Sequence, residues 1–96
     1  MATAEDIDGA GTADERWSAT EMSLWLARKG RWQEAHDLCQ TIPGKPGAWI
    51  HAWLHREEGD YWNACYWYDK AGVEATEEEA SLDDEWWEIA RELLEG

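Results

Sequence analysis

The chain has 96 residues and a net charge of −14, and it contains nine tryptophans and three tyrosines but no phenylalanine. This length predicts a single domain with one modest hydrophobic core. An acidic excess of this size repels phosphate backbones and anionic lipid, so the composition argues against nucleic-acid and membrane-surface partners. A protein or peptide partner with a basic surface remains compatible with the charge.

The cysteines and the N-terminal residues bear on cellular location. Cys39 and Cys65 do not form a Cys-x-x-Cys pair, and two cysteines are too few for a disulfide scaffold. Residues 1–6 lack the basic start and the apolar run of a signal peptide, and no apolar run approaches membrane-spanning length. We therefore expect a cytoplasmic protein with free thiols.

Residues 1–12 are small and acidic and include two glycines. Such a composition buries too little apolar surface to offset the entropy of ordering. We predict a disordered acidic tail over residues 1–12, followed by a single helical-repeat domain over residues 13–96.

The first helix is predicted to begin after Thr12 or after Ser18. Each of these residues is followed three positions later by a glutamate, which is the spacing of a capping box. The helix should run to Lys29 and stop at Gly30. A second helix is predicted over residues 31–41, since its apolar residues recur at helical spacing before Pro43.

The middle of the chain predicts a loop and two further helices. Two prolines and two glycines predict a loop over residues 43–47. A third helix should cover residues 48–58 and end at Gly59, where a left-handed residue is favoured. Asp60 can cap the fourth helix, which ends near Gly72.

The last helix follows an acidic stretch, and Ser81 stands three residues before Asp84 in an N-cap pattern. Its apolar face comprises Trp86, Ile89, Ala90, Leu93 and Leu94. Five helices with no strand signal predict an all-α fold.

A short pattern occurs twice, 29 residues apart: a glycine, an aromatic residue two positions later and an alanine three positions after that. The two copies are Gly30, Trp32 and Ala35, and Gly59, Tyr61 and Ala64. This pattern resembles tetratricopeptide-type (Sel1-like) helix pairs, although the period is shorter than the usual 34 or so residues. The stretch from His51 to Asp60 also resembles short bacterial proteins of unassigned function. The resemblance implies two antiparallel helix pairs, with the last helix as a cap against the third and fourth.

In tetratricopeptide-like folds the first helix of each pair lines a concave groove. The resemblance places two tryptophans one turn apart in that groove, with two arginines whose guanidinium groups suit a carboxylate. We therefore predict a protein-interaction (adaptor or scaffold) module. Its contact surface is predicted to comprise Arg28, Trp49, Trp53 and Arg56, extended by Trp62 and Tyr66.

An alternative function comes from His51 and His55, which lie four residues apart and share one helix face, as a zinc pair requires. No glutamate stands between them in the metalloprotease pattern, so zinc proteolysis is excluded. A small-ligand or metal site would combine them with neighbouring aromatic residues or with further ligands from Glu58, Asp60, Cys65, His36 and Cys39. The competing interpretation is that both histidines serve packing.

Catalysis finds no support in the sequence. The serines lack a glycine-flanked elbow, and phosphate-binding glycine motifs are missing. We expect neither enzyme activity nor a cofactor. A third alternative is a structural homodimer in which an aromatic face forms the contact between the two copies.

Overall fold

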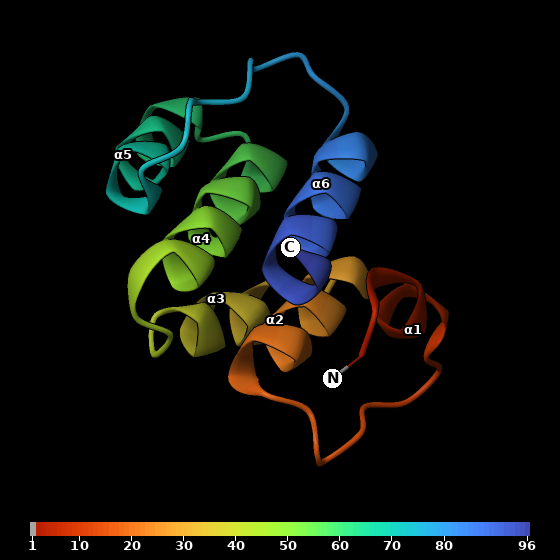
Figure 1. The fold of residues 1–96 in the computed structure, drawn as a ribbon. Coiled ribbons are helices and arrows are strands. Elements are labelled where there is room, and N and C mark those ends of the chain that lie inside the picture. Colours follow the sequence, from red (N-terminus) through yellow and green to blue (C-terminus); the bar gives the residue numbers. More distant parts are fainter. Residues whose placement is uncertain (1) are drawn as a thin grey trace.

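The computed structural model describes residues 2–96, and within them it is all-helical, as the sequence predicts. Six helices are present where the sequence predicts five (Figure 1). They are α1 (Ala4–Gly9), α2 (Ala19–Arg28), α3 (Trp32–Cys39), α4 (Gly44–Glu58), α5 (Tyr61–Ala71) and α6 (Leu82–Glu95). None of these helices is long and apolar enough to cross a lipid bilayer.

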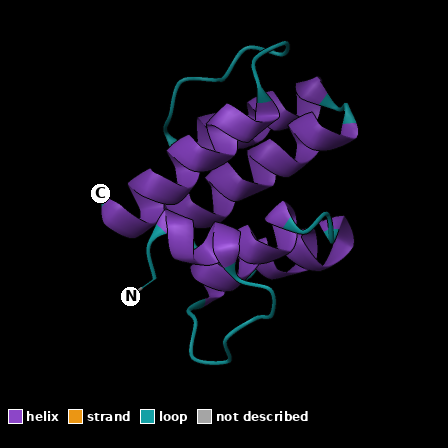
Figure 2. Cartoon of the chain, turned by 90° about the vertical axis from the view of Figure 1, so that its right-hand side faces the viewer, coloured by secondary structure: helices purple, strands orange, loops and turns teal. Residues whose placement is uncertain are grey.

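Helix α4 is the centre of the fold. It packs against α5, α3, α6 and α2, and ten of its residues are buried. Figure 1 shows α5 and α6 on opposite sides of α4, and the view in Figure 2 shows the helices in two stacked layers. Helices α2 and α3 form one pair, and α4 and α5 form the other.

The predicted helix signals near the turns are present in the structure. The Ser18 hydroxyl accepts a hydrogen bond from the backbone N–H of Glu21, whose side chain accepts from the Ser18 backbone, so the capping box begins α2. Gly59 ends α4 with a φ of 90°, in the left-handed region. The Asp60 carboxylate then accepts from the N–H of Asn63 and caps α5.

The predicted loop over residues 43–47 is wrong for most of its length, because α4 begins at Gly44. A proline fits the first turn of a helix, where its missing N–H would have no intrahelical partner. Pro46 lies in that turn. Gly47 is needed there because an added Cβ would lie 1.9 Å from the carbonyl oxygen of Ile42.

The predicted disordered tail is also wrong for the residues that form α1, while Met1 lies outside the described residues. Ala4 and Ile7 are fully buried, and α1 packs against both α2 and α6. The Glu95 carboxylate accepts a hydrogen bond from the N–H of Ala4, and Arg91 pairs with Glu5 at 3.0 Å. This helix is held by long-range contacts, which local composition does not report.

The predicted cap helix, α6, packs against α4, as predicted, and also against α1 and α2. Its contact with α5 is the hydrogen bond that the Tyr68 hydroxyl donates to Glu85. A buried ion pair between Arg56 of α4 and Glu85 of α6 holds it there. Arg56 also donates to the carbonyl of Ala80, and Glu85 accepts from the hydroxyls of Tyr68 and Thr76. The network therefore joins α4, α5, α6 and the segment between the last two.

Four tryptophan side chains tie distant segments together by donating their indole N–H to backbone carbonyls. A buried indole needs such a partner, and each bond here spans at least 15 positions in the sequence. The pairs are Trp25 with Ala10, Trp32 with Leu54, Trp53 with Leu82 and Trp86 with Leu24.

We expect Glu85→Gln to lower the free energy of unfolding by about 3–5 kcal/mol, because it leaves the guanidinium of Arg56 buried without a counter-charge. Urea unfolding followed by circular dichroism measures the change. The exposed Glu88→Gln on the same helix is the matched control and should stay within about 0.5 kcal/mol of wild type. Equal stability of the two variants would contradict a structural role for the pair.

Candidate functional site

The predicted contact groove is closed in the structure. Trp49, Trp53 and Arg56 are only 6%, 5% and 8% exposed, because α6 lies over the face of α4 that carries them. The Trp53 indole donates to the carbonyl of Leu82, and Arg56 is consumed by the buried network. The prediction that these three residues form a contact surface is therefore wrong, since packing of α6 on α4 buries them.

Arg28 is partly exposed, but its guanidinium is already engaged. It pairs with Asp8 at 2.7 Å and with Asp83, and it lies 4.6 Å from the centre of the Trp86 ring. These contacts join α1, α2 and α6. Arg28 acts as a structural link in this arrangement.

The two predicted extensions of the contact surface are exposed. Trp62 is 90% exposed and Tyr66 is 55% exposed, and both lie on the outer side of α5. The ammonium group of Lys70 lies 5.5 Å from the centre of the Tyr66 ring. Of the six predicted partner-binding residues, these two are the large apolar side chains that remain open to solvent.

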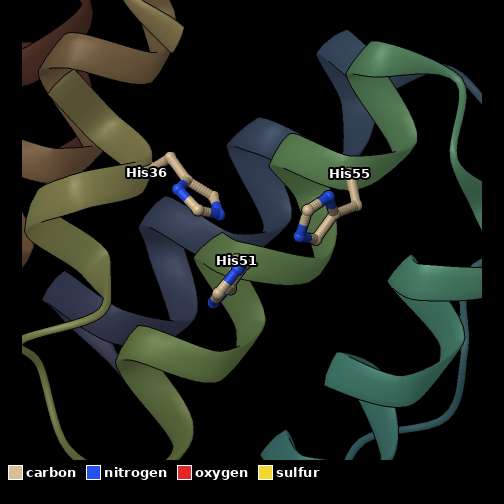
Figure 3. A group of neighbouring side chains, drawn as sticks. All are labelled: His36, His51 and His55. Carbon is tan, nitrogen blue, oxygen red and sulfur yellow. The ribbon is translucent and has the colours of Figure 1, made fainter. Parts of the chain in front are cut away.

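The most concentrated group of functional side chains is formed by His36, His51 and His55, which we call the histidine cluster. His36 comes from α3 and the other two come from α4. One ligand atom from each of the three lies within 4.8 Å of those of the others, and Figure 3 shows the three rings gathered between the two helices. The chain has only three histidines, so all of them converge.

Two indoles enclose the histidine cluster. Trp32 stacks on His36 with 4.7 Å between ring centres, and Trp67 stacks on His51 at 3.9 Å. His51 and His55 are 3% and 6% exposed. The site is thus an aromatic chamber between α3, α4 and α5, in which His36 is half-buried.

The environment keeps imidazoles of the cluster unprotonated. Burial, followed by the neighbouring His36 and His55, lowers the pKa of His51 to about 4. Burial is also the main cause that lowers the pKa of His36. At neutral pH both rings are therefore neutral, and each keeps one nitrogen lone pair for a metal ion.

His55 is oriented by a carboxylate. Its Nδ1 lies 2.6 Å from Oε2 of Glu58, a distance that suits donation of the Nδ1 proton to the carboxylate. The Nε2 lone pair of His55 is then available to a metal. A carboxylate that holds the second nitrogen of a ligating histidine is the usual arrangement around metal ions in proteins.

The cluster fits a divalent transition metal in ligand type and in spacing. A tetrahedral ion about 2.0–2.1 Å from each nitrogen holds the nitrogens about 3.3 Å apart. Side-chain rotations that shorten the distances between the ligand nitrogens by about 1–1.5 Å therefore complete the site. Cys39 does not supply a ligand, since its thiol donates to the carbonyl of His36 at 3.2 Å and burial raises its pKa to about 12. A second group of close ligand atoms joins His55 with Glu58 and Asp60 at the surface.

The sequence identified His51 and His55 as a ligand pair but placed His36 only among possible additional ligands. The signal that would have placed His36 is the repeat itself. In stacked helix pairs the second helix of one pair packs on the first helix of the next, as α3 does on α4. A histidine on that side of α3 therefore faces the pair on α4.

We expect the metal-free protein to lose stability as the pH falls from about 6.5 to about 4. Unfolded chains take up a proton on His51 near its ordinary pKa of 6.5, whereas the folded protein resists protonation down to about 4. The unfolded state therefore binds more protons in this window, which costs up to about 3 kcal/mol. Urea unfolding of wild type and His51→Leu across this range, with a chelator present, measures it. Identical pH dependence in the two proteins would contradict the shift.

Comparison of the chain with protein families, with curated proteins and with solved structures finds no match. The chemistry of the site is therefore the basis of the functional proposal.

Proposed function

We propose that this protein binds a divalent first-row transition metal ion, Zn²⁺, Ni²⁺ or Cu²⁺, through His36, His51 and His55. The observation that carries the proposal is the convergence of all three histidines in one cluster, in which His51 and His55 are buried and His36 is half-buried. Three imidazoles without a thiolate favour these ions over soft ions and over Mg²⁺ or Ca²⁺. The role is binding and not catalysis, and the free thiols of Cys39 and Cys65 suit a cytosolic setting.

The energetic balance of the chamber favours a metal over packing alone. The Nδ1 of His36 is buried without a hydrogen-bond partner, and an unsatisfied buried polar atom costs about 1–3 kcal/mol. Leucine or phenylalanine would fill similar volume between the indoles without that cost. Imidazoles in this position are better explained by a ligand that uses their lone pairs.

A metal ion in the cluster would also join the two helix pairs, because His36 belongs to α3 and His51 and His55 belong to α4. Ligands that bind only the folded state stabilise it by mass action. The carboxylate of Glu58 would offset part of the positive charge of the ion and hold His55 in its ligating orientation.

We expect zinc at a free concentration 100 times its dissociation constant to raise the free energy of unfolding by about 2.7 kcal/mol. Calorimetric titration with Zn²⁺, Ni²⁺ and Cu²⁺, together with thermal unfolding, measures affinity and stabilisation. His36→Gln should lower the affinity most clearly, because it removes the one ligand from α3. Glu58→Gln should lower it by about 10–100-fold through His55.

Asp60→Asn is the matched control, because asparagine preserves the cap of α5 and removes only the carboxylate. It separates the histidine cluster from the surface group of His55, Glu58 and Asp60. An affinity that depends on Asp60 and not on His36 would place the ion at the surface and overturn the proposal, as would the absence of binding.

A second candidate function is protein interaction through α5. It is supported by Trp62, which is 90% exposed, and by its neighbour Tyr66. Exposed aromatic residues of this size concentrate binding energy at interfaces, and the net charge of −14 favours a partner with a basic surface. A second copy of this chain is the alternative occupant.

We expect Trp62→Ser to weaken capture of a basic partner from a cell lysate without changing thermal stability, since the side chain is almost fully exposed. Glu88→Gln, on another helix, is the control for surface changes in general. Light scattering at several concentrations tests the homodimer, and a strictly monomeric protein would exclude it. Recovery of the same partners by wild type and Trp62→Ser would contradict this surface.

A further inference from the structure

His51 differs from His55 in its outer contacts. His55 has the Glu58 carboxylate at 2.6 Å, whereas the Asp37 carboxylate lies 4.0 Å from the Nδ1 of His36, too far for a hydrogen bond. His51 is 97% buried, yet its side chain makes no hydrogen bond to any group within residues 2–96. Figure 3 shows one ring nitrogen of His51 turned toward the other rings and the other turned away from them.

A pocket of about 350 Å³ lies beside His51. It is lined by residues from the end of α3, from the first turns of α4 and from α5: Cys39, Gln40, Gly44, Gly47, His51, Trp67 and Lys70 among them. This volume is in the range of sites for small molecules. The pocket therefore reaches the histidine cluster through His51, which is the histidine among its lining residues.

The electrostatic character of the pocket is opposite to that of the protein as a whole. The net charge is −14, but no aspartate or glutamate is among the described residues that line the pocket, and Lys70 is. The lining also includes the start of α4, a helix of 15 residues whose N-cap, Pro43, provides no side-chain hydrogen bond. An uncapped helix N-terminus and a lysine both favour an anion.

We propose that this pocket binds a small monocarboxylate whose oxygen accepts the second N–H of His51. Lys70 and the N-terminus of α4 balance its charge. The bound carboxylate accepts a hydrogen bond from the outer nitrogen of His51, as the Glu58 carboxylate does from the Nδ1 of His55. The inference rests on the proposed metal site, because a metal on the inner nitrogen fixes the proton of His51 on the outer one.

The two ligands must then strengthen each other's binding. A divalent ion held by three imidazoles brings a positive charge into the cluster, and the N–H of a metal-bound imidazole is a better donor than that of a free one. By thermodynamic linkage, the factor by which the carboxylate raises metal affinity equals the factor by which the metal raises carboxylate affinity. Loss of such an outer partner typically costs about 10–100-fold in metal affinity, so a gain of about tenfold or more is expected.

The test is the ratio of zinc affinities in sodium acetate and in sodium perchlorate at equal ionic strength, measured by competition with a chelating dye. Wild type should bind zinc about tenfold or more tightly in acetate, after correction for zinc acetate in solution. Lys70→Gln should lose most of this gain. The control, Lys29→Gln, removes the same charge from an exposed position at the end of α2. This variant should keep the full gain in zinc affinity in acetate.

The outcomes separate the two proposals. Zinc binding through the histidine cluster with the same affinity in both salts overturns the carboxylate pocket and leaves the metal site standing. A gain that persists in Lys70→Gln also overturns it, because the gain would then come from the bulk salt. Absence of zinc binding in either salt overturns the metal site, and with it this inference.

Discussion

The buried ion pair between Arg56 and Glu85 is the interaction on which the arrangement of the other helices depends. A charge buried on α4 needs a counter-charge, and only α6 supplies one at that place. Once α6 is fixed by this pair, it covers Trp53 and most of Trp49, which are 5% and 6% exposed. The same pair holds the segment after α5, since Glu85 also binds Tyr68 and Thr76.

Because α6 covers one side of α4, only the other side can contribute side chains to a ligand site. With 3.6 residues per turn, Trp49, Trp53 and Arg56 share one side of the helix, and His51 and His55 lie roughly opposite. The first side packs against α6, and the second side faces α3 and α5. Helix α4 therefore separates a structural ionic core from the histidine cluster, and each has its own partners.

Both sides of α4 leave buried polar atoms without a hydrogen-bond partner. On the side that faces α6, the carboxylate of Glu85 and two of the Arg56 nitrogens are hydrogen-bonded, but the Nε of Arg56 and the indole nitrogen of Trp49 are not. In the histidine cluster, the Nδ1 of His36 has no partner and His51 faces a pocket. Unsatisfied groups in a small domain with little stability to spare are the places where a ligand is to be sought.

The sequence by itself determined the all-α class, the turns at Gly30 and Gly59 and the caps at Asp60 and Ser81, because these depend on residues within one turn of each other. It left the first cap between Thr12 and Ser18, and the structure places it at Ser18. It also identified His51 and His55 as a pair, since their spacing places them on one helix face. Only the tertiary structure decided that residues 4–9 form a helix, that α6 closes the groove and that His36 joins the pair. Those outcomes depend on contacts between residues far apart in the chain, and local periodicity carries no information about which distant face a side chain will meet.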